Sequence, residues 1–277
     1  MLHDQRVIFS NNSTLSDLTV NLGNFREGSE VIDYVTSEDY LFIGSFLPFN
    51  HKHFDISVAN DQAATVSVDI WDGTTWRAAV DVIDRTSSSS VSMAQDGIIS
   101  WSTDIDRMWD REQESKDVTG LTGTNIYHMF WVRLSWDASW NALTAIDFIG
   151  QKFAKDADLY DLYPDLNNSA LQTAFESGKS DWEEQHYIAA QHIVRDLKKN
   201  HSILSADQIL DFDLFQEAAI HAAAMVIYWG LGMDEKHNQA KGKYEDNLKQ
   251  GFLNVDVNAD GRLNVYERTL SQGFITR

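Results

Sequence analysis

The chain has 277 residues, of which 43% are hydrophobic and 12% aromatic, enough to build ordinary cores in two domains. It contains no cysteine, which excludes disulfides, thiolate nucleophiles and zinc or iron–sulfur sites that need Cys ligands. The 22 Lys and Arg against 42 Asp and Glu give a net charge of -20, which opposes any long contact with nucleic acid phosphates.

The hydrophobic pattern predicts neither a membrane span nor a secretory leader. The longest apolar run, residues 218–231, is interrupted by His221 and is shorter than the about 20 residues that cross a bilayer. Asp4 and Arg6 stand near the start of the chain, where a leader would have a basic start followed by an apolar centre. We therefore expect a protein made in the cytosol, with no membrane contact.

Residues 1–30 are predicted to form an extended N-terminal arm. They are rich in small polar side chains and contain one short apolar group, Val7, Ile8 and Phe9. A segment with so little apolar surface is expected to have little core of its own and to become ordered upon assembly.

Residues 31–151 have the composition of an antiparallel β-sandwich domain, with many β-branched and aromatic residues between short polar breaks. Apolar and polar residues alternate along 66–71, which predicts one buried face and one wet face, with Trp71 on the wet side. Six strands are predicted, at residues 40–45, 53–59, 64–71, 75–82, 97–102 and 128–136.

The connections between these strands have their own signals. Asp72 and Gly73 indicate a tight hairpin turn, so the strands at 64–71 and 75–82 are expected to pair antiparallel. The polar stretches 87–90 and 110–123 have few apolar anchors and are predicted to be exposed loops.

A linker at residues 152–166 precedes a helical domain at 167–277, because the apolar period changes there from that of strands to that of helices. The predicted fold class is therefore α+β with two domains, an antiparallel β-sandwich followed by an α-helical bundle. The first helix is expected over residues 180–200, with one apolar stripe formed by Trp182, Ala189, Ile193, Val194 and Leu197. The second follows Ser205 and ends near Gly230 and Gly232, and a third, mostly polar helix is expected at residues 235–250. Capping-box spacings at the starts of the first two helices pair Ser180 with Glu183 and Ser205 with Gln208.

Near the C-terminus, DVNADGRLNVYE matches the calcium loop of an EF-hand at each key position. Ca²⁺ needs about six to eight oxygens, and alternating acidic or amide side chains around a turn at Gly261 bring oxygens to one centre. Because one loop stands alone, with ten residues after it, the ion is expected to be structural; the alternative is an acidic turn without metal. The predicted ligands are the side chains of Asp256, Asn258, Asp260, Asn264 and Glu267 and the carbonyl of Arg262.

No catalytic arrangement stands out, and we expect a protein that is not an enzyme. The nine histidines fall in no familiar metal-binding spacing, although His51 and His53 share one face of a strand. Seven tryptophans of the β half could stack on sugars, but they fit core and interface positions better. Acid pairs with a spacing open to glycoside hydrolysis arise by chance among 42 acidic residues; they are Asp81 with Asp84 and Asp104 with Asp106.

Two parts of the sequence resemble structural proteins of tailed bacteriophages. In the β half the resemblance covers about residues 40–149 and lies in VDIWDGTTWRAAVDVIDRTSSSS, QDGIISWSTDIDRMW and IYHMFWVRLSW. The helical half, with AAIHAAAMVIYWGLG, KHNQAKGKYEDNLKQGF and the calcium-loop segment, resembles the adaptor family that lies beneath the phage portal.

This resemblance implies a head-to-tail connector adaptor of the virion. About a dozen copies would form a ring that joins the portal to the tail, with genomic DNA passing through the lumen without specific binding. The partners would be other copies of the chain, the portal protein and tail or neck proteins. The large β domain ahead of the helices departs from small adaptors, and it leaves the level within the neck open.

Two alternatives remain. The segment DVNADGRLN also resembles half of a dockerin, so a secreted carbohydrate-binding β-sandwich protein with a dockerin-like calcium loop is one of them. Dockerins carry two such loops, whereas this chain shows one. The other alternative is a tail or baseplate structural protein, which differs only in its location within the particle.

Overall fold

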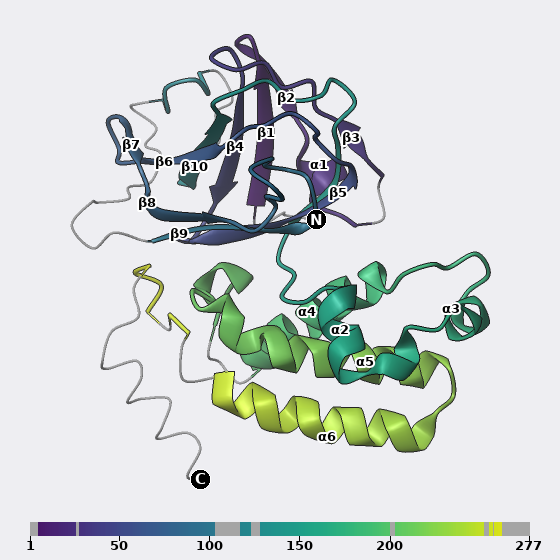
Figure 1. Ribbon diagram of the computed structural model, residues 1–277. Coiled ribbons are helices and arrows are strands. Elements are labelled where there is room, and N and C mark those ends of the chain that lie inside the picture. The colour runs from purple at the N-terminus through teal and green to yellow at the C-terminus, as the bar shows by residue number, and fades with distance from the viewer. Residues whose placement is uncertain are drawn as a thin grey trace. The chain divides into compact units, whose positions relative to one another are not determined.

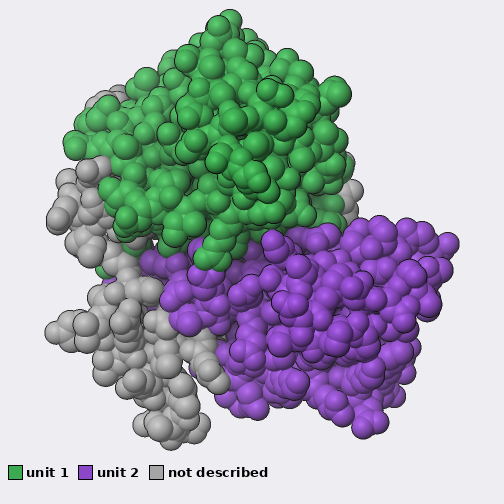
Figure 2. All heavy atoms as spheres, in the orientation of Figure 1, with its two compact units in different colours: residues 1–150, 260–262 green, residues 151–259, 263–277 purple. Residues whose placement is uncertain are grey.

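The chain divides into two compact units, one of residues 1–150 with 260–262 and the other of 151–259 with 263–277 (Figure 2). Antiparallel sheets make up the first unit and helices the second, which confirms a mixed α+β layout (Figure 1). No helix in the described part of the chain combines the length and hydropathy of a membrane crossing. The computed structural model describes residues 5–25, 28–102, 117–122, 128–199, 203–251, 255–256 and 258–261.

The first unit contains two sheets in which all neighbouring strands are antiparallel. The six-stranded sheet has the order β2 (Thr14–Asp17), β1 (Gln5–Asn11), β4 (Tyr40–Ser45), β10 (Phe130–Trp136), β6 (Val66–Trp71) and β7 (Trp76–Ala78). The five-stranded sheet has the order β3 (Glu30–Val31), β11 (Ala145–Gly150), β5 (His51–Val58), β9 (Gly97–Ser102) and β8 (Val80–Asp84). A single helical turn, α1 (Thr19–Leu22), follows β2.

The N-terminal segment is not the arm that its composition suggested. Its apolar group lies in β1, an inner strand that pairs with β2 on one side and with β4 on the other. Val7 is fully buried in a hydrophobic cluster that draws residues from both sheets, and Ile8 is buried on the opposite face of the six-stranded sheet. The sequence pattern missed this strand because its partner β4 lies about 35 residues further along the chain, beyond any local signal.

The strand predicted at residues 75–82 is two strands in different sheets. The hairpin of β6 and β7 forms as expected, but its turn has four residues, and Gly73 has the positive φ of 87°. After Ala78 the chain leaves this sheet, and β8 pairs instead with β9 of the other sheet. A left-handed Asp81, with φ of 52°, accompanies a register irregularity in β8, which local sequence did not reveal.

The six-stranded sheet has apolar side chains on both faces. One hydrophobic cluster draws buried residues from both sheets, among them Ile43 of β4 and Ile149 of β11. A second cluster lies on the other face of the six-stranded sheet and includes Trp71, which the alternation rule had assigned to water. Val118 and Leu121 belong to this cluster, so this part of the loop predicted to be exposed is instead buried against the sheet. The cluster consists of Ile8, Phe42, Trp71, Val118, Leu121, Met129 and Trp131.

The second unit begins with α2 (Asp156–Leu162), inside the predicted linker. The later helices are α3 (Ser169–Phe175), α4 (Glu183–Lys199), α5 (Gln216–Gly230) and α6 (Asp234–Gly251), with short 3₁₀ turns at Pro164–Leu166, Ala206–Gln208 and Phe212–Phe215. In α4 and the residue before it, the predicted stripe of Trp182, Ala189, Ile193 and Leu197 is buried, whereas Val194 is half-buried. Helices α5 and α6 pack against each other along their length (Figure 1).

The two predicted capping boxes had different outcomes. Helix α4 begins at Glu183 itself, so Ser180 is no cap, and its hydroxyl donates to Asp181 instead. The box of Ser205 and Gln208 is present, but it closes a 3₁₀ turn and not the long helix, which begins at Gln216. Capping-box spacing can mark any tight turn that exposes backbone N–H groups. At Ser205 the spacing therefore predicted the cap correctly but not the kind of helix that follows it.

Gly44 of β4 allows the ring of Trp131 to lie directly across the strand. A Cβ added at Gly44 would come within 2.8 to 2.9 Å of three ring atoms. Its backbone φ is not positive, so the need for glycine here is purely one of space. Trp131 is fully buried and paired with Gly44 across β10 and β4, so the ring has nowhere to move.

We therefore predict that Gly44→Ala destabilises the first unit by about 1–3 kcal/mol, because the new methyl overpacks a closed cluster. Gly242→Ala is the matched control. It lies in α6 with open space around its Cβ, so alanine should leave stability unchanged or raise it by up to about 1 kcal/mol. Urea unfolding followed by tryptophan fluorescence and circular dichroism measures both, and equal effects of the two substitutions would contradict the prediction.

Candidate functional site

The first half of the predicted calcium loop lies within the described residues. Asp256 is fully buried, and two hydrogen bonds to Gln208 hold its backbone. The Asp256 N–H donates to the Gln208 carbonyl at 2.9 Å, and the Gln208 Nε2 donates to the Asp256 carbonyl at 2.5 Å. Asn258 and Asp260 are exposed. The remaining predicted ligands, Arg262, Asn264 and Glu267, lie outside the described residues.

The backbone of this segment fits a tight metal-binding turn. Gly261, at the position where the motif requires a sharp turn, has φ of 80°, and Ala259 also has a left-handed φ of 60°. Glycine at 261 is needed for space as well, because an added Cβ would lie 2.9 Å from the Cβ of Pro48. Ala259 lies between Asn258 and Asp260, and Gly261 follows Asp260. The side chains of Asp256, Asn258 and Asp260 offer hard oxygens, a donor set that suits Ca²⁺.

The two histidines of β5 have different side-chain partners in the first unit. His53 Nε2 is 2.8 Å from Asp55 Oδ1, and both side chains are buried. His51 Nδ1 is 2.8 Å from the side-chain oxygen of Asn50, so the two rings have separate partners. The sequence suggested His51 and His53 as a pair, whereas the structure gives each a neighbouring residue as its partner.

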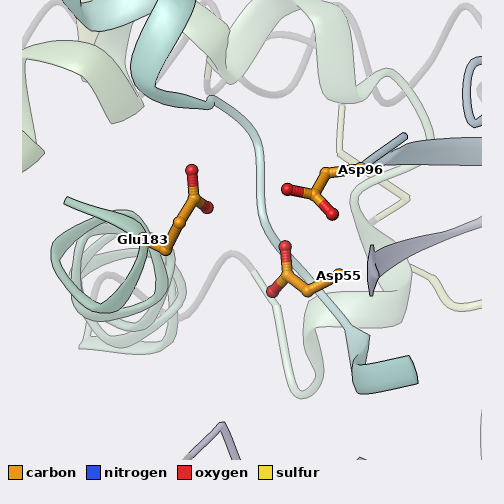
Figure 3. Close-up of side chains that lie close together, drawn as sticks. All are labelled: Asp55, Asp96 and Glu183. Atoms are coloured by element: carbon orange, nitrogen blue, oxygen red, sulfur yellow. The ribbon is translucent and has the colours of Figure 1, made fainter. Parts of the chain in front are cut away.

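A second carboxylate approaches Asp55 in this unit. Oxygens of Asp55 and Asp96 lie within 4.8 Å of each other (Figure 3). Asp96 also accepts a hydrogen bond from the Ile56 N–H at 2.6 Å, which fixes its carboxylate against β5. Figure 3 also labels Glu183, the first residue of α4 in the second unit, where it forms an ion pair with the buried Lys152. No sequence pattern indicated Asp55 or Asp96, and Glu183 was predicted only as part of a capping box.

Asp156 is the centre of a polar cluster in the second unit. Its carboxylate accepts hydrogen bonds from the Tyr160 hydroxyl at 2.8 Å and from the Trp182 N–H at 3.1 Å, and it lies 3.1 Å from His186 Nε2. Burial alone would raise the pKa of Asp156, but the hydrogen bond and charge of His186, with the other donors, hold it below the usual value. Asp156 thus joins α2 to Trp182, the residue before α4, and to His186 within that helix.

A second cluster connects the end of α2 with α5. The hydroxyl of Tyr163 lies 2.9 Å from Nδ1 of His221, whose Nε2 is 3.5 Å from a Glu217 oxygen. Burial, followed by the charges of Asp165 and Glu217, raises the pKa of Tyr163 to about 12, and burial lowers that of His221. At neutral pH the hydroxyl therefore donates to a neutral imidazole, and a high-pKa phenol is a poor nucleophile.

The remaining chemical candidates of the sequence occupy structural positions. Asp84 accepts hydrogen bonds from Thr86 and Ser92, whereas Asp81 is exposed in the irregular part of β8. Asp104 and Asp106 lie outside the described residues. Five tryptophans of the β half are at most 5% exposed, which leaves their faces closed to a sugar; they are Trp71, Trp101, Trp131, Trp136 and Trp140.

The Asp156 cluster predicts a pH dependence of the second unit. Because the pKa of Asp156 is lower in the folded chain than its ordinary 3.8, its contribution to stability is complete above 3.8 and is lost as pH falls through the folded value. Asp156→Asn should lower the free energy of unfolding by about 1–3 kcal/mol at pH 7 and reduce its loss on acidification. Helical circular dichroism in urea from pH 7 to about 2 measures this. Asp161→Asn, at an exposed position of α2, is the control and should behave as the native chain does.

Sequence relationships assign none of these groups. No known protein family matches the chain, and no curated protein matches it. A functional assignment therefore depends on the motifs of the chain itself and on the contacts that the structure gives to their residues.

Proposed function

We propose that this chain is a structural protein of a tailed-phage virion, an adaptor of the head-to-tail connector. In this proposal the two sheets form a β-sandwich, the helices form a bundle, and copies of the chain form a ring between the portal and the tail. The role is structural and not enzymatic. The observation that carries the proposal is the use of the phage-like motif residues, which meet in two side-chain clusters of the first unit.

The first cluster joins the W-D-G-x-x-W hairpin to the W-V-R-L strand. Trp71 and Trp76 pack edge to face, with ring centroids 5.4 Å apart. The guanidinium of Arg133 lies 5.0 Å from the centre of the Trp76 ring and 4.6 Å from that of Tyr40, and it pairs with Asp69 at 2.6 Å. Arginine between two aromatic faces and a carboxylate is a fixed structural clamp.

The second cluster joins the D-x-T turn to the end of the same strand. The Asp84 carboxylate accepts from the Thr86 N–H at 2.8 Å and, through its other oxygen, from the Ser92 hydroxyl at 2.6 Å. That hydroxyl in turn accepts from Trp136 Nε1 at 2.8 Å. The chain Asp84, Ser92, Trp136 connects strands of both sheets by satisfied, buried hydrogen bonds.

Through these contacts, motif residues that lie far apart in the sequence stabilise the same domain. A motif that specifies a scaffold is what a structural family would share, whereas an enzyme family would share residues that face a substrate. The charge of -20 supports the same proposal, because a negative lumen lets DNA pass without adhering to the wall. The buried tryptophans count against the sugar-binding alternative.

The proposal includes one structural Ca²⁺ in the loop at residues 256–267. Asp256, Asn258 and Asp260 would contribute side-chain oxygens, as would Asn264 and Glu267, and Arg262 would contribute its carbonyl. The ion would supply a fixed positive centre around which the last residues of the chain become ordered. The anchoring of Asp256 by Gln208 gives such a loop a fixed first ligand.

The location in the particle tests the main proposal. Reconstruction of a tailed-phage particle that contains this chain should show it as a ring on the axis between portal and tail. Density for the chain at the baseplate or along the tail would replace the adaptor with the tail-protein alternative. A purified monomer that binds polysaccharide, with no place in a particle, would favour the carbohydrate-binding alternative.

The calcium loop is tested by two substitutions in the full chain. Glu267→Gln should weaken calcium binding far more than Asn264→Ala, because Glu267 offers two oxygens and a charge whereas Asn264 is expected to act through water. Calcium titration calorimetry compares them. Chelation should increase proteolysis after Gly251 and leave the first unit intact. No calcium in a metal analysis, together with equal cleavage with and without chelator, would show an acidic turn.

A further inference from the structure

Strand β2 is an edge of the six-stranded sheet with an outward-facing row of backbone groups. Its register with β1 continues to the Leu18 N–H, which donates to the Val7 carbonyl at 2.9 Å. Hydrogen-bonded pairs alternate along an antiparallel ladder, so Ser16 bonds to β1 and its two neighbours do not. The N–H and C=O groups of Leu15 and Asp17 therefore point away from the sheet.

Contacts at both ends of β2 hold the strand in an extended conformation. The turn before it has left-handed residues Asn12 and Ser13, with φ of 45° and 68°, which suit the twist of a two-residue hairpin. At its other end Asp17 pairs with Arg6 at 3.1 Å and accepts from the Thr19 N–H at 2.9 Å. The strand contains no proline, lysine or bulge, and its one charged residue, Asp17, is already paired with Arg6, so the main remaining protection of this edge is its length of four residues.

We propose that β2 pairs antiparallel with β2 of a second copy, about a two-fold axis at Ser16. The outward groups then match themselves: Leu15 of one copy faces Asp17 of the other, and the reverse pair forms on the far side of the axis. Each pair exchanges two backbone hydrogen bonds. A strand edge is self-complementary in this arrangement, so a second copy satisfies it without any further partner.

The side chains of β2 also suit a second copy. Leu15 packs at the margin of the second hydrophobic cluster, and the axis is perpendicular to the sheet, so both Leu15 side chains lie on one face as diagonal neighbours. Asp17 faces Leu15 and not another carboxylate, and Arg6 already compensates its charge. The net charge of -20 on each copy opposes the pair at long range, so salt should strengthen it.

This inference goes beyond the proposed function. Neighbours in a ring with one rotation axis are related by that rotation and not by a two-fold axis, so they cannot share this contact. We therefore assign the pair to the free protein, before a copy enters a ring. Pairing of β2 would occupy the edge before assembly and keep it from other strands.

The absence of cysteine makes a clean test possible. Ser16→Cys in the full chain would place two thiols across the axis, at a non-hydrogen-bonded pair with Cα atoms about 4.5 Å apart, within the range of a disulfide. Mild oxidation should convert this variant to a covalent dimer. Ser88→Cys, at an exposed position of another loop, is the matched control and should remain monomeric.

A second variant removes an outward donor together with the Leu15 side chain. Leu15→Pro deletes one N–H that points away from β1, and proline is tolerated on the free side of an edge strand. Added to Ser16→Cys, it should abolish the covalent dimer while circular dichroism shows an unchanged fold. Equal cross-linking of Ser16→Cys and Ser88→Cys would overturn the pairing, wherever the chain lies in a particle. A Ser16-linked dimer of a chain that is absent from the portal axis would support the β2 pairing and rule out the adaptor function.

Discussion

The six-stranded sheet must be covered on both faces, and this constraint organises the first unit. Trp131 lies across Gly44 on one face, while Ile43, one position earlier in the same strand, is buried on the other. One face shares its cluster with the five-stranded sheet, and the other is closed by Val118 and Leu121 of a connecting segment. Without that segment the aromatic residues of the second face would stand in water, at a cost of about 25 cal/mol for each Å² exposed.

This two-sided burial explains which strands the sequence revealed. Strands β4 and β9 have the predicted bounds, because each is a continuous apolar run between polar breaks. The alternation rule failed at Trp71, since it assumes one wet face. The sequence pattern did not predict strand β11. It also did not predict that β7 and β8 are separate strands, because the sheet that each strand joins depends on distant partners and on the backbone conformation of Asp81.

The candidate site divides in the same way. A linear motif such as residues 256–267 can be recognised from its spacing, because its donors are neighbours in the chain. The contact of Asp55 with Asp96 and that of Asp156 with His186 join residues far apart in sequence, and no local pattern predicts them. The phage-like strings were recognised as motifs, but the clamp at Arg133 and the bonds of Asp84, which explain their residue types, required the fold.

Gln208 is a position where only an amide serves. Its Oε1 accepts from the N–H groups of Leu204 and Ser205 while its Nε2 donates to the Asp256 carbonyl, so one planar group acts as acceptor and donor at once. An ionised glutamate could keep the first role but would repel the carbonyl, and methionine would lose both. The side chain of Gln208 thus joins two chain segments that lie 48 residues apart in the sequence. Replacing the amide at this position would therefore release the Asp256 carbonyl from the turn before α5.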